Sequence, residues 1–271
     1  MIRYNKNGVT YYAFSHIDAT GMVNHAFSTR LGGVSKGYYS ELNLGLHQND
    51  DIFAVKENYC RICEAIEQDI SDIVVSDQYH TTNLHIVTKN DKGKEFFVKR
   101  HLEYIDGLVT NQKDILLTTY YADCVPLLFL DKRLKVIANC HAGWRGSLDN
   151  MAGKTVLYMQ YNFGSRASDI LVGIGPSISK AHFEVDFDVY EHFKGFVPAT
   201  AYISESLTKP EKWHIDLWGI NQECLKLAGI PSENIEVAGL CTYENKHEFY
   251  SHRRDGAKRG NLAAMIALRG L

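Results

Sequence analysis

Hydrophobic positions in this chain follow two patterns, one of short apolar runs and one with helical spacing. The short runs are rich in β-branched and aromatic residues and predict strands. They cover residues 9–14, 23–28, 73–76, 84–88, 115–120, 126–130, 134–139, 170–173 and 235–238. Helical spacing predicts helices, several starting at a Ser or Asp that can cap. These cover residues 51–70, 147–161, 186–193, 216–227 and 262–268.

Several of the predicted strands follow one another with no helix between them, which favours an α+β fold over a doubly wound parallel sheet. The chain has only five prolines and no Ser/Gly-rich or charge-rich stretch that would mark a linker. We therefore expect a single layered domain over residues 1–271, with mixed β-sheets flanked by helices.

Composition narrows the classes of partner. With 271 residues and 45% hydrophobic side chains, the chain can bury a substantial core. A formal net charge of −3 provides no basic field for nucleic acid, so small molecules are the expected partners. Residues 1–14 lack a secretory signal, and the longest apolar stretch, 115–130, is interrupted by Asp123 and Pro126. We expect a cytoplasmic protein with no membrane partner.

The six cysteines are few for this length, and a reducing compartment would keep them as thiols. Cys60 and Cys63 form a C-x-x-C inside the helix expected at 51–70. No second such pair supports a zinc knuckle or a redox centre, so two buried helix thiols are the prediction. Residues 30–50 are rich in glycine, which fits either a loop folded against a ligand or another backbone, or a surface loop with two turns.

Candidate chemistry is concentrated in three short segments. His80 comes just after the strand expected at 73–76, where functional side chains tend to emerge. Asp123 and Cys124 form a polar pair between two strongly apolar runs. His141 begins a glycine-rich turn between the strand at 134–139 and the helix expected from Ser147.

Imidazole and thiolate ligands from three separate strand ends match Zn²⁺ and leave a fourth position open, which is typical of a catalytic site. The expected ligands are His80, Cys124 and His141. Cys140 is left out because adjacent side chains on a strand point to opposite faces. The alternative is that these are ordinary core residues, since twelve histidines make chance candidates plentiful.

Two polar residues close in sequence to the expected ligands have two interpretations each. Arg145 and the backbone N–H groups before Ser147 could seat a phosphate, or Arg145 could cap an ordinary surface turn. Asp123 could orient a metal ligand or make a structural hydrogen bond, and the structural role is favoured.

Eight blocks carry a resemblance that spans nearly the whole chain in order. They are Thr29-Arg30-Leu31-Gly32-Gly33-Val34-Ser35, Asn43-Leu44-Gly45, Gln78-Tyr79-His80, Asp106-Gly107-Leu108-Val109-Thr110, Ala122-Asp123-Cys124-Val125-Pro126, His141-Ala142-Gly143-Trp144-Arg145-Gly146, Gly175-Pro176-Ser177-Ile178 and Tyr250-Ser251-His252-Arg253-Arg254-Asp255. In these blocks the chain resembles the YfiH-type, or laccase-domain, family of purine nucleoside phosphorylases, also described as polyphenol oxidases. The Asp-Cys-Val-Pro and His-Ala-Gly-Trp-Arg-Gly blocks are highly specific.

The resemblance implies a layered YfiH-like, or cysteine-hydrolase-like, fold with zinc on the same His, Cys and His, which are also the catalytic residues. It implies phosphorolysis of adenosine, inosine and methylthioadenosine to free base and pentose 1-phosphate, with adenosine deamination as a side activity. Purine nucleosides and phosphate are then the partners, and copper is possible in the same site.

Substrate-binding residues follow from the same blocks. They are Arg30, Asn43, Gln78 and Arg145. The two arginines are the candidates to hold phosphate oxygens. The chain departs from the family at Lys258-Arg259-Gly260-Asn261, where many members carry Thr-Gly-Arg, and Arg259 is a candidate substitute.

Three other functions stay open. In a Cys-His hydrolase or deamidase, His141 would activate Cys124 as a nucleophile without any metal. Copper-dependent phenol oxidation would need one copper in the same site, because the chain has none of the His-x-His pairs of a blue multicopper oxidase. A binding module without catalysis is disfavoured by an open ligand position.

Overall fold

Two six-stranded mixed sheets and one small sheet make up the β-structure of this computed structural model, which describes residues 1–46, 49–92 and 102–270. The first sheet has the order β1 (Ile2–Lys6), β2 (Val9–Ala13), β3 (Val23–Ser28), β15 (Leu262–Leu268), β7 (Leu116–Tyr121) and β4 (Ile73–Val75). The second has the order β14 (Ile235–Val237), β10 (Ile170–Ile174), β8 (Val125–Asp131), β9 (Val136–Ala142), β6 (Gly107–Thr110) and β5 (Leu84–Ile86). The small sheet has the order β11 (Glu184–Val185), β13 (Trp213–Ile215) and β12 (Ile203–Glu205).

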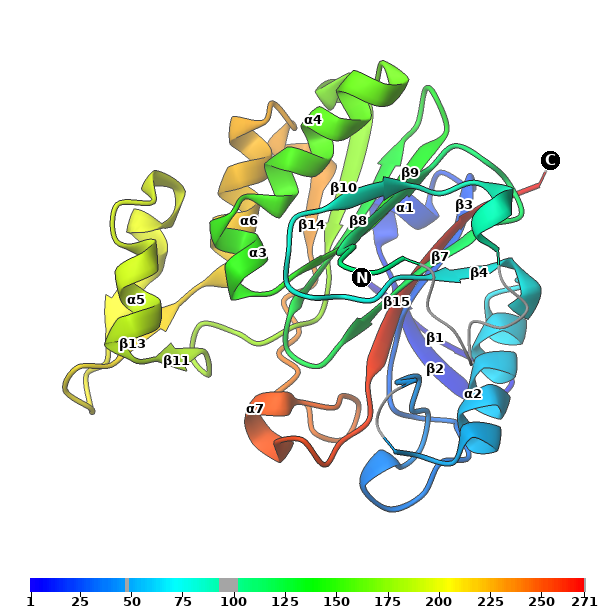
Figure 1. Cartoon of the computed structure of the whole chain (residues 1–271), viewed down its shortest axis with the longest axis horizontal. Coiled ribbons are helices and arrows are strands. Elements are labelled where there is room, and N and C mark those ends of the chain that lie inside the picture. The colour runs from blue at the N-terminus through cyan, green and yellow to red at the C-terminus, as the bar shows by residue number, and fades with distance from the viewer. Residues whose placement is uncertain (47–48, 93–101, 271) are drawn as a thin grey trace.

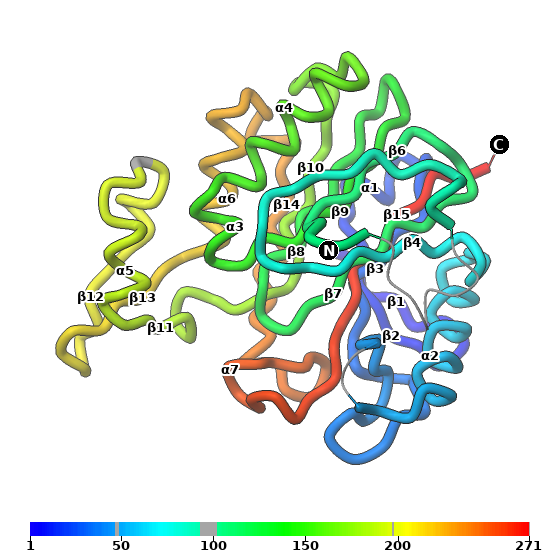
Figure 2. Tube along the Cα trace, in the orientation of Figure 1, coloured from blue at the N-terminus to red at the C-terminus, as the bar shows by residue number. Residues whose placement is uncertain are grey.

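Helices pack against the sheets or follow the loops between the strands. They are α1 (Ser15–Asp18), α2 (Ile52–Ala65), α3 (Trp144–Leu148), α4 (Met151–Phe163), α5 (Phe187–Phe193), α6 (Leu217–Leu227) and α7 (His252–Asp255). Figure 1 shows α4 and α6 along the second sheet and α2 beside the first, with separate hydrophobic clusters under each. The small sheet and α5 project from one side, as the trace in Figure 2 also shows. The predicted α+β class with mixed sheets flanked by helices is therefore confirmed.

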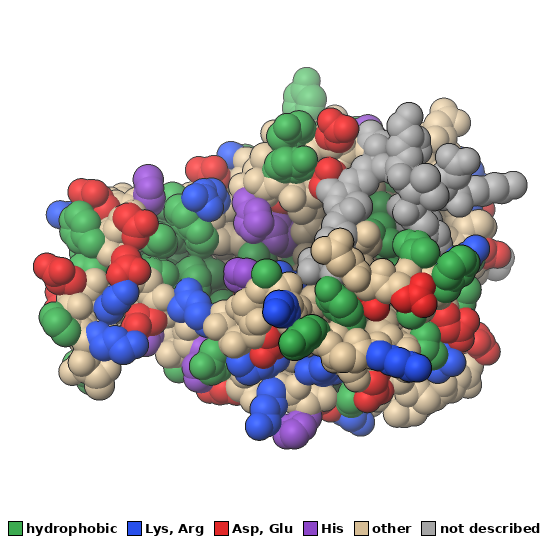
Figure 3. Space-filling view, turned by 60° about the horizontal axis from the view of Figure 1, so that its bottom comes forward, with side chains coloured by type: hydrophobic (Ala, Val, Ile, Leu, Met, Phe, Trp, Pro, Cys, Tyr) green, Lys and Arg blue, Asp and Glu red, His purple; other side chains and the backbone are tan. Residues whose placement is uncertain are grey.

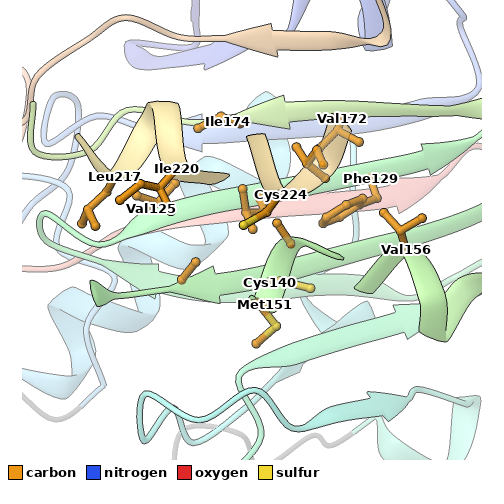
Figure 4. Packing of buried hydrophobic residues seen from close by; sticks show 14 of the residues in the cluster. Val125, Phe129, Cys140, Met151, Val156, Val172, Ile174, Leu217, Ile220 and Cys224 are labelled. Carbon is orange, nitrogen blue, oxygen red and sulfur yellow. The ribbon is translucent and has the colours of Figure 1, made fainter. Parts of the chain in front are cut away.

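Alternation along β8 and β9 divides the interior into two layers. Val125 and Phe129 pack toward the helices, whereas Leu128 packs between the two sheets. In β9, Cys140 joins the helix-side cluster, which Figure 4 shows together with Met151. The prediction that the side chains of residues 140 and 141 point to opposite faces of the strand is confirmed. His141 points away from the helix-side cluster and contacts Tyr121, which packs between the two large sheets.

The predicted helix at 262–268 is wrong, because this segment is strand β15. Its Ala, Leu and Met residues are good helix formers, but every residue of the segment is buried. The strand pairs with β3 on one side and β7 on the other, at the centre of the first sheet. Burial on both faces and two hydrogen-bonded neighbours outweigh intrinsic propensity here.

Other predicted boundaries also need correction. The single helix expected from Ser147 is two helices, α3 and α4, separated at Asn150, whose φ is 59°. The helix expected at 51–70 ends at Ala65, and Cys60 is exposed, so only Cys63 is a buried helix thiol. Strands β1, β6, β11, β12 and β13 had no prediction, and β6 proves important for the site.

The glycine-rich stretch predicted at 30–50, of which residues 47–48 lie outside the described residues, folds against other backbone at Gly32 and Gly33. A Cβ at Gly32, whose φ is +93°, would lie 2.2 Å from the carbonyl oxygen of Gly8, and a Cβ at Gly33 would lie 2.3 Å from that of Glu41. These close approaches explain the two glycines without a ligand. None of the helices in the described part of the chain has the length and hydropathy needed to cross a bilayer.

Candidate metal centre

Three strand ends bring His80, Cys124 and His141 together. His80 lies in the loop after β4, Cys124 in the turn between β7 and β8, and His141 near the end of β9. One potential ligand atom from each lies within 4.8 Å of the others, and His80 Nε2 is 3.8 Å from Cys124 Sγ. The two imidazole rings meet edge to face at 4.9 Å. The three residues therefore form one cluster, as the sequence had predicted.

A buried carboxylate that was not among the predicted site residues bonds to the His141 ring and to the backbone of His80. Asp106, which directly precedes β6, accepts a hydrogen bond of 2.9 Å from His141 Nδ1. The same carboxylate accepts the backbone N–H groups of Tyr79, His80 and Thr81. It thus holds the His80 loop, where φ of His80 is +60°, and leaves His141 Nε2 for a metal or a thiol.

The three side chains also alter one another's ionisation. Burial raises the pKa of Cys124, but the His141 and His80 imidazoles outweigh it and bring that pKa to about 6. Burial lowers the pKa of His141, but the Cys124 sulfur and the Asp106 carboxylate raise it to about 9. Between these values the metal-free cluster holds a thiolate beside an imidazolium, so metal binding must displace a proton from His141.

Gly143 lets the chain pass close to the cluster. A Cβ at this position would lie 2.7 Å from His80 Cδ2 and 3.2 Å from Cys124 Sγ. Its φ of −68° is available to any residue, so the requirement is for space alone. Gly143 caps α3, which begins at Trp144 and carries Arg145 away from the cluster.

The cluster opens into two hollows that share His80, Ala122, Cys124 and His252. The larger, of about 400 Å³, is large enough for a nucleoside-sized ligand. It is lined by Leu46, Ser76, Asp77, Gln78, His80, Tyr120, Tyr121, Ala122, Cys124, His141, His252, Arg259 and Asn261. The smaller, of about 230 Å³, extends toward Trp144 and Phe183. Figure 3 shows this side of the molecule, with histidine side chains gathered near its middle.

Asp123 has the structural role that the sequence favoured. Its Oδ1 accepts from the Thr242 hydroxyl at 2.7 Å, and its Oδ2 accepts from the Ser251 hydroxyl and from the Arg253 N–H. These bonds tie the turn that carries Cys124 to two distant loops.

The residues expected to bind substrate lie in different places. Gln78 lines the larger hollow, but its amide pairs with the backbone N–H and C=O of Tyr120. Asn43 is buried and bonds to Asp50 and to backbone N–H groups. Arg30 lies in a separate hollow and donates to the Ser40 carbonyl, while Arg145 is exposed and stacks on Trp144.

Two lining residues lie in the C-terminal part of the chain: His252, which was not among the predicted site residues, and Arg259, which was predicted only as a candidate substitute for a family arginine. The exposed imidazole of His252 borders both hollows, and its Nδ1 lies 3.2 Å from the Gly256 carbonyl oxygen. Arg259 borders the larger hollow, and its buried Nε has no hydrogen-bond partner among the described residues. His252 belongs to a block that carries the family resemblance, whereas Arg259 lies where the chain departs from the family, and sequence spacing gives no sign that either approaches Cys124.

The donor set fits a zinc-class ion. Metal–ligand bonds of about 2.0–2.3 Å at tetrahedral angles place two ligand atoms about 3.5 Å apart, close to the 3.8 Å between His80 Nε2 and Cys124 Sγ. The carboxylate behind His141 is the usual partner of a metal-bound imidazole. Thiolate and imidazole also suit copper, so the donor set alone does not choose between the two metals.

Comparison with known proteins gives consistent results. Residues 24–269 match the family model described as multi-copper polyphenol oxidoreductase laccase. The chain is 36% identical over 246 residues to purine nucleoside phosphorylase YlmD of Bacillus subtilis, covering 90% of this chain and 87% of the relative. It is 31% identical to adenosine deaminase RL5 of an unknown prokaryotic organism, covering 87% and 90%. The crystal structure of YlmD from Geobacillus stearothermophilus superposes with a TM-score of 0.90 at 31% identity, covering 99% of each chain.

Proposed function

The chain belongs to the family described as multi-copper polyphenol oxidoreductase laccase, and within it we propose a zinc-dependent purine nucleoside phosphorylase. It is an enzyme, as its relatives named phosphorylase and deaminase are. The observation that carries the proposal is the His80, Cys124 and His141 cluster, oriented by Asp106 and open to a hollow of about 400 Å³. Adenosine, inosine and methylthioadenosine are the proposed nucleosides, with phosphate as the second substrate.

Zinc is the proposed metal, held by His80, Cys124 and His141, with copper as the other candidate for the same three ligands. When bound, the ion would supply a Lewis acid. Adenosine deamination is proposed as a side activity of the same site, supported by the relative named adenosine deaminase. Phenol oxidation ranks below both, because a multicopper centre needs more clustered histidines than this site has.

Phosphorolysis makes two demands that residues near the cluster can meet. A phosphate oxygen bonds to C1′ of the ribose while the C1′–N9 bond breaks, and the electron pair leaves with the base. The departing base then needs a proton, for which we propose His252. If its Nδ1–H donates to the Gly256 carbonyl, its Nε2 can carry the transferred proton.

Arg259 is our candidate for holding phosphate. Its guanidinium donates to the Gly260 carbonyl and to Asn261, but its buried Nε is unpaired in the described structure. Burial lowers the pKa of this arginine, which an incoming anion would offset. Arg259 is a better candidate than Arg30, whose donors bind the Ser40 and Lys246 carbonyls. Arg145, which is exposed and stacks on Trp144, remains a second candidate for holding phosphate.

The test follows base release by chromatography. Metal-quantified protein is incubated with inosine or adenosine, with and without phosphate, beside Cys124→Ala and His80→Ala. Phosphate-dependent release of hypoxanthine or adenine, lost in both variants and retained in Cys60→Ser on the exposed face of α2, is expected. Unchanged nucleoside in the presence of bound zinc would overturn the phosphorylase assignment.

Replacing His252 by Gln separates proton transfer from metal binding. General acid catalysis contributes about 100-fold or more, so kcat for inosine should fall by about that factor while zinc content stays the same. Full activity in His252→Gln would remove this residue from the mechanism and leave the phosphorylase assignment intact.

A second function has one specific observation in its favour. Cys124, His141 and Asp106 form a thiol–imidazole–carboxylate series, and the pKa of about 6 makes Cys124 a thiolate at neutral pH. A cysteine hydrolase or deamidase would use this series without metal. Protein stripped of metal that still hydrolyses an amide or ester, and that iodoacetamide inactivates at Cys124, would establish it; inactive metal-free protein would rule it out.

A further inference from the structure

A second group of metal-ligand side chains lies outside the site described above. His182 lies between β10 and β11, and Cys241 and Glu244 form a turn that follows β14. His182 Nδ1 is 3.8 Å from Cys241 Sγ and 3.4 Å from Glu244 Oε1, and the three ligand atoms all lie within 4.8 Å of one another. We refer to these residues as the second cluster and to His80, Cys124 and His141 as the first.

We propose that the second cluster binds a divalent cation of the zinc class through His182 Nδ1, Cys241 Sγ and a Glu244 carboxylate oxygen. Tetrahedral zinc places thiolate and imidazole ligand atoms about 3.6 Å apart, and imidazole and carboxylate atoms about 3.3 Å apart. The observed separations of 3.8 and 3.4 Å need only small side-chain adjustments to meet this. Sulfur, nitrogen and oxygen ligands together favour zinc over the hard cations calcium and magnesium.

The backbone that carries these ligands is fixed by two neighbouring arginines. Arg253 Nη1 donates to the carbonyls of His182 and Glu184, at 3.2 and 2.7 Å. Arg254 Nη1 donates to the carbonyls of Thr242 and Tyr243, at 2.9 and 2.8 Å. Each loop is therefore held before any ion binds, which reduces the conformational entropy lost on binding.

The side chains are oriented as well. The His182 ring stacks on Tyr243, with 4.3 Å between centroids and an angle of 22°. The buried Cys241 sulfur accepts the backbone N–H of Ser179 at 3.3 Å, a contact that fixes the position of the sulfur beside the His182 ring. Glu244 is 56% exposed, so it can move toward an ion and leave a fourth position open to water.

An ion pair between His182 and Glu244 would explain part of this arrangement without metal. It would not explain why Cys241 turns its sulfur to the same imidazole nitrogen and why a backbone N–H points at that sulfur. An ion bound here would crosslink two loops that border the first site. One carries Ile178 and Phe183, which line the smaller hollow, and the other carries Thr242.

The experiment counts zinc by mass spectrometry after dialysis against a zinc buffer, using the full chain. We expect two equivalents in the wild type and about one in Cys241→Ser and in Glu244→Gln. Controls matched by residue type are Cys60→Ser and Glu205→Gln, both exposed, which should keep two. Glu244→Gln alters an exposed side chain, so it keeps the test decisive if Cys241→Ser fails to fold.

Cobalt distinguishes the two clusters directly. The first cluster has no thiol in Cys124→Ser, whereas the second keeps Cys241. A thiolate-to-cobalt charge-transfer band in the near ultraviolet is therefore expected in this variant, and it reports cobalt bound at the second cluster. This band should vanish in Cys124→Ser/Cys241→Ser. Zinc content unaffected by Glu244→Gln, together with no cobalt band in Cys124→Ser, would overturn the second site. Neither readout depends on catalysis, so failure of the phosphorylase assignment would be seen separately.

Discussion

The two clusters use similar ligands but are built differently. In the first, His80 lies in a loop after β4, Cys124 in a turn before β8 and His141 in β9, and the buried Asp106 carboxylate bonds to the His141 ring and to the backbone N–H of His80. In the second, the ligands come from two loops, and arginines fix the backbone rather than the ligating side chains. The sulfur of Cys124 is half-buried beside a large hollow, whereas that of Cys241 is fully buried.

This difference suggests a division of roles. A site that must present an open position to a substrate benefits from ligands that buried neighbouring groups hold rigidly. A cation that only joins two loops needs no adjoining substrate hollow. The two clusters are connected, since Thr242, next to Cys241, donates to Asp123, next to Cys124. Four substitutions or treatments test how far the clusters differ.

The largest effect is expected from Asp106→Asn. An amide cannot accept the four contacts that the carboxylate receives from the Thr81 side chain and the 79–81 backbone, and it pairs less well with His141. Zinc affinity of the first cluster should fall by about 100-fold. Titration with a competing chelator measures it. Asp131→Asn, at another buried carboxylate that accepts backbone N–H groups, is the matched control and should leave this affinity unchanged.

Gly143→Ala should weaken the first cluster by about 10-fold, because the new Cβ displaces His80 and such overpacking costs about 1–3 kcal/mol. Gly146→Ala is the matched control, since its Cβ would have no neighbour closer than 3.5 Å. Chelator competition again gives the affinity, and equal values for the two variants would contradict the steric argument.

Removing the metal should expose a pH-dependent thiol. With the pKa of Cys124 at about 6, the reactive thiolate is lost below that pH, so iodoacetamide should label it about tenfold faster at pH 7 than at pH 5. Mass spectrometry of the peptide gives the rate. Cys63, whose pKa burial raises to about 12, should stay unlabelled at both pH values. A rate for Cys124 that still rises steeply above pH 8 would contradict the His141 pairing.

The smallest change in metal affinity is expected from Thr242→Val. Losing its bond to the Asp123 carboxylate should lower the free energy of unfolding by about 1.5–3 kcal/mol, measured by denaturant titration. Zinc affinity of either cluster should change less than about threefold, because no ligand or ligand-orienting group is removed. Thr118→Val, which breaks a 3.3 Å bond to a neutral carbonyl, should cost less stability. A larger loss of zinc would show that the clusters are coupled through Thr242.

Much of the fold was readable from local pattern. The predicted β-runs at 23–28, 126–130 and 170–173 correspond to β3, β8 and β10, because β-branched and aromatic runs bounded by polar residues have few other stable states. The first cluster was also found, since His80, Cys124 and His141 each follow or flank a strong apolar run. The single domain and the cytoplasmic location stay predictions.

The amino-acid sequence by itself therefore determined the mixed α+β class, the family and the three residues that form the first cluster. Only the tertiary structure decided that residues 262–268 form a central strand, because burial on both faces outweighs their helix propensity. It alone brought Asp106 to His141 and His182 to Cys241, pairs that are 35 and 59 positions apart along the chain. Such contacts depend on strand order and loop paths, which local periodicity does not encode.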